Sequence, residues 1–520
     1  MVRTLQDLVA ALPFPYQLLP AGMAETPITG VIDDSRRIQP GFLFVAYPGV
    51  AVDGHRFIHD AIRRGAKAVV CERQQEGIDV PQVLVPNGRQ ALAHLCAAWY
   101  GFPSRSLVTV GVTGTDGKTT TTNLIYNILR CAGYRAGMIS TVNAVIGERV
   151  VDTGLHTTTP DADEVQYYLA QMRDAGMTHC VLEITSHSLA QHRVDAVDVD
   201  IAVVTNITHE HLDLHGSYES YRSAKARLFE MLDRPDVTSV ERREATKPHL
   251  RHTAVLNADD TYSFDTLRSI SVERQIAYSL HEVAGWPEGQ SVYLLSASHE
   301  PGNMRLQVST PGGEVELATA LIGDYNVSNI LAAISATVAL DVPLEAVQQG
   351  ISTFRAVPGR MERIDVGQPY TAIVDFAHTP NALQQVLRAL RPITRGRLIV
   401  VFGCAGERDV QKRPMMGRIA AELADEVVLT AEDPRRENLA LILDQIEAGT
   451  RMGANVKHAG VHRVPDRAEA IRFACSLARA GDTVIACGKG HEQSMCFGTI
   501  ETPWDDREAM HDAVQRTLEG

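Results

Sequence analysis

One stretch of the chain combines residue types that can bind phosphate. An alternating apolar run at 108–113 leads into a glycine-rich turn, and an apolar helical pattern then continues through Leu124 and Leu129. The turn consists of Gly114, Thr115, Asp116, Gly117, Lys118, Thr119 and Thr120. A helix N-terminus attracts anions through its unpaired N–H groups, a lysine reaches terminal phosphates, and a threonine hydroxyl can ligate Mg²⁺. The sequence therefore predicts a nucleoside triphosphate site.

This turn departs from the strict P-loop spacing at one position. The strict pattern requires glycine where Val112 stands, so the turn is a shortened variant. An ordinary glycine-rich turn before a helix is the alternative. The preceding strand and the Lys-Thr-Thr that opens the helix favour the phosphate loop.

Further polar residues follow other predicted strands of the same region. Glu183 ends an apolar run, where a carboxylate suits Mg²⁺, although a solvated strand-end acid is the alternative. Histidines at 209, 211 and 215 could converge on zinc, but no cysteine partner or HExxH helix accompanies them. One histidine contributed to a magnesium–phosphate site fits better. Lys225, on the next helix, is by itself an ordinary surface lysine.

Three charged loops each follow a predicted strand near the carboxyl end of the chain. The first, 403–413, gathers Arg408, Lys412 and Arg413; the others are 432–435 and 488–492. Loops after parallel strands open on one edge of a sheet, where ligands bind. Surface charge is the alternative for each loop alone, but together the loops suit an anionic substrate.

Alternation of strand and helix patterns predicts an α/β protein of three domains. We expect a small α/β domain at 1–105, a central P-loop-type doubly wound sheet at 106–356, and a Rossmann-like domain at 357–520. Residues 234–253 are polar and charged and predict an exposed loop. The strands within 291–315 predict an antiparallel flap.

The composition is that of an ordinary soluble globular protein. The chain has 520 residues, of which 45% are apolar and 22% charged, and a net charge of −14 disfavours binding to nucleic acid. Its eight cysteines are scattered without a C-x-x-C pair, as in reduced cytosolic proteins. No apolar run approaches ~18 residues and the N-terminus is a poor signal peptide, so we expect a cytoplasmic protein without membrane insertion.

Characteristic sequence blocks follow one another in order from about Asp34 to Glu508. They are GTDGKTT, HTTTP, EITSHSLAQHRV, NITHEHLDLHGSYESYRSAK, NADD, GDYNVSN, PGRME, VDFAHTP, VFGCAGERDVQKRP, EDPR, GKGHE and DDREA. In these blocks the chain resembles the Mur ligase family, most closely the type that adds the third residue of the peptidoglycan stem. The resemblance implies an ATP-dependent ligase: ATP phosphorylates a carboxylate of UDP-MurNAc-L-Ala-D-Glu, and an amine of a diamino acid attacks the acyl phosphate. Magnesium and lysine would neutralise the charge that develops. We expect a monomer.

The resemblance also implies roles for individual residues. Lys118, Glu183, His211 and Lys225 would be catalytic. Mg²⁺ would be held by Thr119, Glu183, His211 and Lys225, the lysine being carbamylated by CO₂. ATP would contact the phosphate loop together with Asn326, Asn329, Arg360, Asp375 and His378. The UDP-linked substrate would contact Ser35, Thr158, Thr159, Thr185, Gln191 and Arg193. The incoming amino acid would contact Arg408, Glu432, Asp433, Pro434, Arg435, Gly488 and Glu492.

Two departures from the family pattern bear on the substrate. Ser188 replaces a glycine, and Glu432-Asp433-Pro434-Arg435 stands where diaminopimelate-adding members have Asp-Asn-Pro-Arg. The arginine could pair with the distal carboxylate of diaminopimelate, whereas the added aspartate would favour the bare ammonium of lysine or ornithine. The sequence favours diaminopimelate, with lysine and ornithine as alternatives. A folylpolyglutamate ligase, a P-loop kinase and a non-catalytic nucleotide-binding protein are more distant alternatives.

Overall fold

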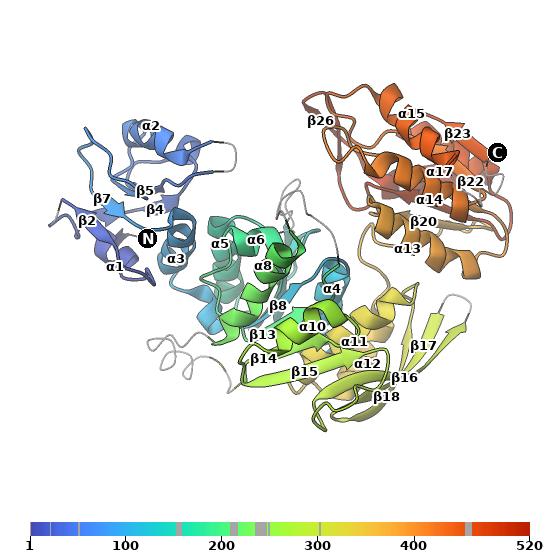
Figure 1. Ribbon diagram of the computed structural model, residues 1–520, viewed down its shortest axis with the longest axis horizontal. Helices are drawn as coiled ribbons and strands as arrows, with labels where there is room; N and C mark the ends of the chain where they lie inside the picture. Colours follow the sequence, from blue (N-terminus) through green and yellow to red (C-terminus); the bar gives the residue numbers. More distant parts are fainter. Residues whose placement is uncertain are drawn as a thin grey trace. The chain divides into compact units, whose positions relative to one another are not determined.

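A computed structural model shows where these residues lie (Figure 1). It describes residues 2–20, 22–49, 52–151, 159–208, 217–233, 247, 250–300, 303–452 and 460–519. The chain divides into two compact units. The first comprises Met1–Leu295, Val308–Val315 and Ser328–Gly350, and the second comprises Ser296–Gln307, Glu316–Val327 and Ile351–Gly520.

The N-terminal part of the first unit is a five-stranded sheet. Its strand order is β2 (Gln17–Leu19), β7 (Gln82–Leu84), β6 (Ala68–Cys71), β5 (Phe42–Val45) and β4 (Gly30–Ile32). Alternate side chains of these strands feed two separate apolar clusters, because successive residues of a strand point to opposite faces. Helices α1 (Leu5–Val9) and α3 (Gly88–Trp99) cover one face, and α2 (Ile58–Arg63) covers the other.

The central sheet contains the strand that leads into the phosphate loop. It runs in the order β11 (Arg149–Val151), β10 (Ala144–Ile146), β9 (Ala136–Ile139), β12 (His179–Glu183), β8 (Val108–Thr113), β13 (Ile201–Val204), β14 (Thr253–Asn257), β15 (Arg274–Ser279), β16 (Ser291–Glu300), β17 (Asn303–Thr310) and β18 (Gly313–Thr319). The strands from β9 to β16 pair in parallel. Parallel strands bring their carboxyl ends to one edge, so the residues after β8, β12 and β13 meet there.

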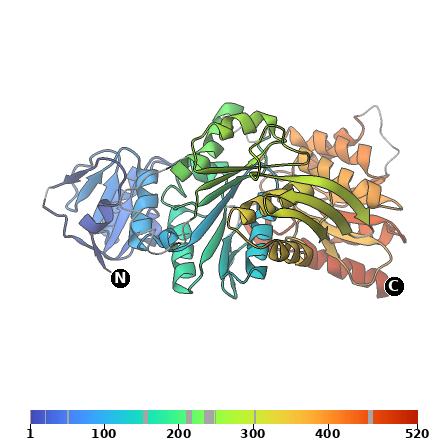
Figure 2. The ribbon, with the colours of Figure 1, turned by 90° about the horizontal axis from the view of Figure 1, so that it is seen from below.

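Helices lie on both sides of this sheet (Figure 2). One face packs against α5 (Ala162–Asp174), α6 (Ser186–Ala190), α8 (Tyr218–Glu230) and α10 (Thr261–Arg268). Helix α4 (Lys118–Cys131) contacts β8, β9 and β12 through a buried stripe that includes Leu124, Ile125 and Ile128. This i, i+1, i+4 spacing is the apolar face that the sequence pattern predicted. The doubly wound central domain is confirmed.

The strands expected to form a flap extend the central sheet instead. Strand β16 pairs in parallel with β15, and β17 and β18 are the next neighbours in the same sheet. Alternate residues of β17 and β18 are buried, so these strands have one packed face. Helices α11 (Tyr325–Val338) and α12 (Leu344–Thr353) follow in the chain.

The C-terminal part of the second unit is a six-stranded sheet. Its order is β19 (Glu362–Ile364), β20 (Thr371–Asp375), β24 (Thr483–Cys487), β21 (Leu398–Phe402), β22 (Glu426–Leu429) and β23 (Gly460–Arg463), and all pairs except β19–β20 are parallel. Helices α13 (Pro380–Leu390), α14 (Lys412–Leu423) and α15 (Leu439–Thr450) pack on one face. Helices α16 (Arg467–Leu477) and α17 (Asp506–Glu519) pack on the other. The small hairpin β25 (Ser494–Phe497) and β26 (Ile500–Pro503) completes this part.

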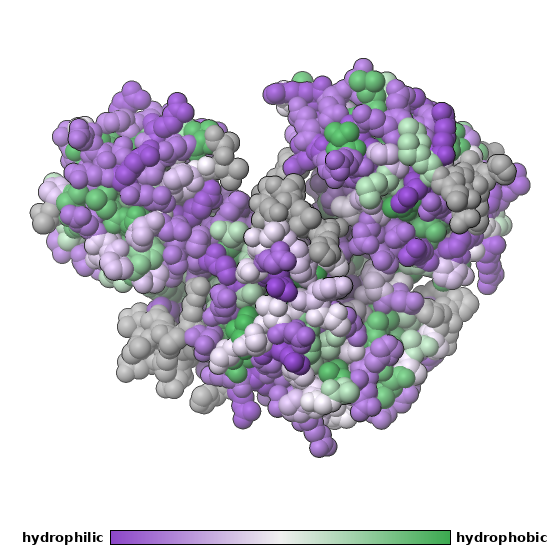
Figure 3. All heavy atoms as spheres, in the orientation of Figure 1, coloured by the Kyte–Doolittle hydropathy of each residue, from purple (hydrophilic) through white to green (hydrophobic). Residues whose placement is uncertain are grey.

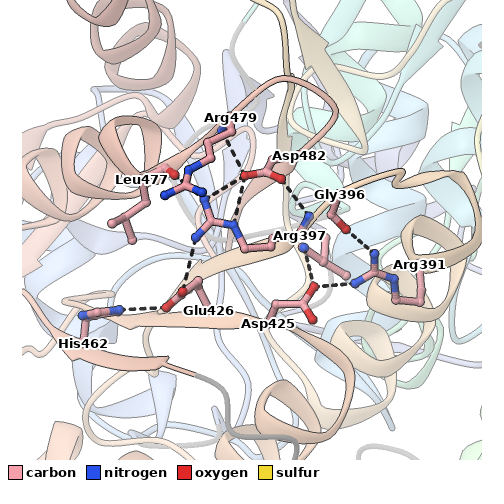
Figure 4. Close-up of polar contacts among 10 residues, drawn as sticks. Arg391, Gly396, Arg397, Asp425, Glu426, His462, Leu477, Arg479 and Asp482 are labelled. Atoms are coloured by element: carbon pink, nitrogen blue, oxygen red, sulfur yellow. Dashed lines mark hydrogen bonds and ion pairs between the residues drawn. The ribbon is translucent and has the colours of Figure 1, made fainter.

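The amino edge of this C-terminal sheet is held by arginine–carboxylate pairs (Figure 4). Arg397 donates to Asp482 through Nε at 3.2 Å and through an NH2 nitrogen at 2.9 Å, and it also donates to the Leu477 carbonyl. Arg391 pairs with Asp425 at 2.5 Å. Arg397, Asp425 and Asp482 directly precede β21, β22 and β24. The pairs therefore stabilise the amino edge of the sheet, opposite to the predicted binding loops.

Several expectations concern the whole chain. All eight cysteines are free thiols, as their spacing predicted. Within the described part of the chain, no helix has both the length and the apolar character needed to span a bilayer. The face drawn in Figure 3 is mostly hydrophilic with scattered apolar residues. Most of the polar segment 234–253 lies outside the described residues; its Lys247 is buried and pairs with Asp200 at 2.9 Å.

Candidate active site

The phosphate loop has a backbone that requires glycine at two positions. Gly114 has φ +150°, and a Cβ there would lie 1.8 Å from Oγ1 of Thr205. Gly117 has φ +81°, and a Cβ there would lie 2.1 Å from Oδ1 of Asn329. Both contacts are far too short for any larger residue, and a positive φ further favours glycine. The loop then enters α4 at Lys118, so the first N–H groups of that helix face the turn.

The two residues that follow β13 hold the phosphate loop by hydrogen bonds to its backbone. The Asn206 carbonyl accepts a hydrogen bond from Thr115 N at 2.7 Å, and its Oδ1 accepts one from Asp116 N at 3.0 Å. Thr205 Oγ1 donates to the Asp116 carbonyl at 2.5 Å. These two residues open the histidine-containing segment, but sequence reasoning did not single them out because hydrogen bonds to a loop's backbone leave no sequence pattern.

Two residues predicted to bind Mg²⁺ meet at the carboxyl edge of the central sheet. Thr119 Oγ1 donates to Glu183 Oε1 at 2.9 Å, and Thr141 N donates to Glu183 Oε2 at 2.9 Å. Glu183 is buried at the end of β12. The alternative of a solvated acid is wrong. A hydroxyl and a carboxylate are hard oxygen donors of the kind Mg²⁺ prefers, so the pair fits that ion.

Two lysines donate to carbonyls of the phosphate loop. Lys118 Nζ donates to Thr115 O at 2.7 Å, and Lys225 Nζ donates to Gly114 O at 2.6 Å. Lys225 is only 1% exposed and lies 4.5 Å from the Tyr221 ring centre, so it is not an ordinary surface lysine. The Tyr221 hydroxyl lies 3.0 Å from Thr115 Oγ1. Sequence reasoning missed this tyrosine, one helical turn before the lysine.

Other predicted residues of the loop region have mixed outcomes. Thr120 is half-buried in the first turn of α4. His211 and its neighbouring histidines lie outside the described residues, as does Thr158. No cluster of three or more His, Cys, Asp or Glu side chains suited to a metal is present in the part of the chain that the structure describes.

Four of the residues predicted to hold the UDP-linked substrate lie together. Thr159 Oγ1 donates to Glu183 O at 3.0 Å, and Thr185 N donates to Thr159 Oγ1 at 3.1 Å. Arg193 donates to the Thr159 carbonyl at 2.9 Å and to Gln191 Oε1 at 2.8 Å. This group therefore adjoins Glu183, whose carboxylate accepts the hydrogen bond from Thr119. Ser35 is buried in a 3₁₀ turn of the N-terminal domain.

Two predicted nucleotide residues contact the ring of Phe376, directly after β20, and a third, Asp375, precedes this ring in the chain. The Arg360 guanidinium lies 4.3 Å from the Phe376 ring centre, and the His378 ring lies 4.5 Å from it. Asp375 accepts hydrogen bonds from Met361 N at 2.6 Å and Ala377 N at 2.8 Å. Burial raises the pKa of this carboxyl. Sequence reasoning missed Phe376, although it stands inside a quoted block.

Two further predicted nucleotide residues lie on α11. Asn326 Nδ2 donates to Ile322 O at 2.7 Å. Asn329, one turn later, is the residue that approaches Gly117.

The loop after β22 has an unusual backbone. Asp433 and Arg435 both have positive φ, at +39° and +51°. Side chains other than glycine adopt this region at a cost, and such residues cluster at functional sites. Arg435 N donates to Cys496 O at 3.1 Å, which fixes the loop against β25. Its guanidinium makes no hydrogen bond or ion pair with any residue that the structure describes.

The Asp433 carboxylate is already paired inside the protein. Lys489 Nζ lies 3.0 Å from both of its oxygens, and Cys496 N donates to Oδ1 at 2.9 Å. Lys489 is fully buried and also pairs with Glu492 at 2.6 Å. Sequence reasoning did not predict a role for this lysine, because nothing in the spacing of the two blocks shows that they touch.

Glu432 is a buried acid with an unpaired oxygen. Its Oε2 has no hydrogen-bond partner among the described residues, and a Cβ on Gly488 would lie 2.6 Å from that atom. Burial raises the pKa of this carboxyl to about 7, and the charge of Lys412 opposes the rise. A buried polar oxygen without a partner is unusual and favours a ligand or a donor that completes its hydrogen bonding.

The cationic loop 403–413 does not act as one group. Arg413 is buried and donates to Glu437 at 2.9 and 3.0 Å and to Gln445 at 2.8 Å. Lys412 donates to the His378 carbonyl at 2.8 Å. Of the three cations, Arg408 alone is exposed. Arg413 and Lys412 thus donate to internal acceptors, whereas Arg408 lies at the surface, and their part in binding an anionic substrate stays a prediction.

Comparison with known proteins shows the family of this chain. Three family descriptions match the chain: "Mur ligase family, catalytic domain" at residues 27–100, "Mur ligase middle domain" at 112–337, and "Mur ligase, glutamate ligase domain" at 359–490. The chain is 45% identical over 487 residues to the UDP-N-acetylmuramyl-tripeptide synthetase of Roseiflexus sp. (strain RS-1), covering 92% of this chain and 93% of that one. It is 41% identical over 497 residues to the UDP-N-acetylmuramoyl-L-alanyl-D-glutamate–2,6-diaminopimelate ligase of Gloeobacter violaceus, covering 95% of each.

Solved structures agree with the fold. One, titled as a UDP-N-acetylmuramoyl-L-alanyl-D-glutamate–2,6-diaminopimelate ligase, superposes with a TM-score of 0.68 at 28% identity over 100% of both chains. The folylpolyglutamate synthase of Mycobacterium tuberculosis shares the fold alone, with a TM-score of 0.59 at 18% identity over 82% of this chain and 94% of that one. The three-domain fold and its phosphate loop define an ATP-dependent ligase. The chain belongs to the Mur ligase family.

Proposed function

We propose that this ligase joins meso-2,6-diaminopimelate to the D-glutamate of UDP-MurNAc-L-Ala-D-Glu during peptidoglycan precursor synthesis. The γ-phosphoryl group of ATP passes to the substrate carboxylate, the amine attacks the acyl phosphate, and an amide, ADP and phosphate result. A carboxylate is inert towards an amine at neutral pH, so this activation is required. Relatives of about 40% identity over most of their length carry the name of this reaction, which supports the proposal.

ATP is assigned to the phosphate loop. The turn from Gly114 to Thr120 receives the phosphates, with Lys118 as the mobile cation that leaves Thr115 O to reach them. Asn326, Asn329, Arg360, Asp375 and His378 are assigned to the rest of the nucleotide. The ring of Phe376 joins this group, because it already contacts both Arg360 and His378.

Mg²⁺ is assigned to the Thr119–Glu183 pair. When bound there, it would neutralise negative charge on the phosphates. We also assign Lys225 and His211 to a second Mg²⁺, with Lys225 carbamylated. Carbamylation turns a cation into an anion, and the burial of Lys225 directly beneath Gly114 O supports its placement at the phosphates.

The UDP-linked substrate is assigned to Ser35, Thr158, Thr159, Thr185, Gln191 and Arg193. Thr159 and Thr185 adjoin Glu183, so a carboxylate held there would lie beside the Mg²⁺ that the proposal places at the same residue. Arg193 is oriented by Gln191 and supplies a fixed cation for an anionic substrate.

The choice of diamino acid depends on one observation. The Arg435 guanidinium has no hydrogen-bond or ion-pair partner among the described residues, whereas Asp433 is paired with Lys489. A free guanidinium can pair bidentately with the distal carboxylate of diaminopimelate, which lysine and ornithine lack. The neutralised Asp433 gives little attraction to a bare distal ammonium. Arg408, Glu432, Pro434, Gly488 and Glu492 complete the proposed amino-acid site.

The decisive experiment measures phosphate release from ATP with UDP-MurNAc-L-Ala-D-Glu, Mg²⁺ and bicarbonate. Diaminopimelate, lysine and ornithine are offered separately, with a folate and glutamate pair as the control for the related ligase activity. We expect turnover with diaminopimelate and at least about tenfold less with the other two. Preferred turnover with lysine or ornithine would mean that the site recognises a bare distal ammonium and would contradict the choice of diaminopimelate. Turnover only with the folate pair would contradict the muropeptide substrate. We further propose that the enzyme works as a monomer in the cytoplasm, which sedimentation and cell fractionation test.

A further inference from the structure

Arg467 is a buried arginine beneath the proposed amino-acid site. It opens α16, and its side chain is 0% exposed. Nε donates to Asp506 Oδ1 at 2.7 Å, and an NH2 nitrogen donates to Asp506 Oδ2 at 2.6 Å. Asp506 also accepts from Trp504 Nε1 at 2.8 Å. This bidentate pair fixes the plane of the guanidinium.

The remaining donors of Arg467 reach two backbone carbonyls. One NH1 hydrogen goes to Ala431 O at 3.1 Å, and one NH2 hydrogen goes to Cys487 O at 2.9 Å. Ala431 directly precedes Glu432, and Cys487 directly precedes Gly488. The guanidinium therefore connects the last fixed residues before the two loops that face each other at the site.

The sheet joins these two loops only through an intervening strand, and Lys489 of one loop also pairs with Asp433 of the other. They follow β22 and β24, which are not neighbours in the sheet, because β21 lies between them. Ladder hydrogen bonds therefore cannot join their carboxyl ends directly. Glu432 Oε2 nevertheless approaches Gly488 so closely that a Cβ there would lie 2.6 Å away. Such a contact demands that the two loops keep a fixed separation.

We infer that Arg467 is a positioning residue that holds the Glu432 and Gly488 loops at the separation needed to bind the incoming amine. It lies under the site and contacts the backbone before the loops, so it acts through them. This inference rests on the proposed function insofar as those loops bind the amino acid. The arginine is suited to the role, since its planar fork serves a carboxylate and two carbonyls at once, which a lysine ammonium cannot match.

The test compares Arg467→Lys with Arg397→Lys. Arg397 is the matched control, because it also pairs through two nitrogens with an aspartate and donates to a backbone carbonyl, but at the opposite edge of the same sheet (Figure 4). We expect Arg467→Lys to raise KM for diaminopimelate about tenfold while KM for ATP and for the UDP-linked substrate stays within about twofold. Arg397→Lys should lower stability without moving any KM. A uniform rise in all three KM values, or no rise for the amine, would overturn the inference.

A second readout is independent of turnover. Hydrogen–deuterium exchange should quicken in 432–437 and 488–496 together in Arg467→Lys and in neither loop in Arg397→Lys. If both loops stay protected, the inference fails even where the ligase activity is present. If the wild type shows no ligase activity but exchange still quickens in both loops of Arg467→Lys, the inference is retained and the proposed function is rejected. Where Arg467→Lys does not fold, Trp504→Phe removes one donor to Asp506 and should raise the same KM about threefold; an unchanged KM would count against the role.

Discussion

Lys489 Nζ lies 3.0 Å from each carboxylate oxygen of Asp433, and both side chains are buried. The sequence alone gave Asp433 as a negative charge facing the substrate, in conflict with Arg435. The structure removes that conflict, since a lysine from the loop after β24 takes the charge. Asp433 is thereby part of the framework that holds the loop, and the distal carboxylate of the amine is assigned, as proposed above, to Arg435.

Asp433→Asn should leave the choice of amine unchanged. The amide keeps the shape of the side chain, and Lys489 retains Glu492 as a partner. We expect diaminopimelate to remain preferred over lysine, with stability lower by about 1–3 kcal/mol because a buried charged hydrogen bond is lost. Arg435→Ala should abolish the preference, whereas Arg436→Ala, an exposed neighbour, should not. Steady-state kinetics with both amines measures this, and a switch to lysine in Asp433→Asn but not in Arg435→Ala would contradict it.

Thr119 should be needed for its hydroxyl. Thr119→Val removes the oxygen that donates to Glu183 and keeps the shape, whereas Thr119→Ser keeps the oxygen. We expect the valine variant to lose at least about 100-fold in kcat and to need more Mg²⁺ for half-maximal rate. The serine variant should stay within about fivefold of the wild type. Equal losses in both variants would show that packing, and not the oxygen, is what matters.

Lys225 should make the enzyme depend on CO₂. In buffer stripped of CO₂ the wild-type rate should fall, and bicarbonate should restore it, because the carbamate forms reversibly on the amine. Arg227→Lys would disturb Asp195 and is no control, so Arg222→Lys serves instead; its half-buried side chain on the same helix donates to the Tyr262 carbonyl. Lys225→Arg cannot be carbamylated and should be inactive with or without bicarbonate. A wild-type rate indifferent to bicarbonate, with an unmodified Lys225 in the intact mass, would rule out the carbamate.

Glu432 should make stability fall as pH rises. Its pKa is about 7 in the folded protein, above the ordinary 4.5, because burial disfavours the charged form. The folded state thus binds the proton more tightly, so the contribution to stability is complete below pH ~4.5 and is lost as pH rises through 7. The loss is on the order of 3 kcal/mol at most. Glu432→Gln should remove this slope.

Urea unfolding of wild type and Glu432→Gln at pH 5, 6, 7 and 8 measures the difference. The comparison of the two proteins isolates Glu432 from other groups, including His491, whose pKa burial lowers to about 3. Parallel profiles for the two proteins would mean that a water or ion satisfies the carboxylate in solution.

Gly488→Ala should weaken binding of the amine. The residue has φ +112°, and a Cβ would lie 2.6 Å from Glu432 Oε2. Gly498→Ala is the matched control, since Gly498 also has positive φ, +66°, but nothing lies within 4 Å of its Cβ. Both variants should lose about 1 kcal/mol of stability for the backbone conformation. Only Gly488→Ala should raise KM for diaminopimelate, by about tenfold or more; similar KM values in both variants would contradict the close approach.

The sequence by itself determined the elements and much of the chemistry. Strand β8, the glycine turn and α4 follow from a period-2 run, two glycines and an apolar helical spacing, because these depend on neighbours in the chain. The strands that precede or end at Glu183, Glu432 and Gly488 were likewise predicted from their apolar runs. Their loops open on one edge of a sheet for topological reasons that hold in any parallel sheet.

Only the tertiary structure decided which charged side chains pair with one another inside the protein. Lys489 neutralises Asp433, Arg413 pairs with Glu437, and Arg467 connects two loops that are more than fifty residues apart in the chain. Periodicity reports only local geometry, whereas a salt bridge between distant segments depends on distances that the fold sets. For the same reason Lys225, unremarkable in the sequence, is buried beneath the phosphate loop, and Arg408 remains exposed while its cationic neighbours do not.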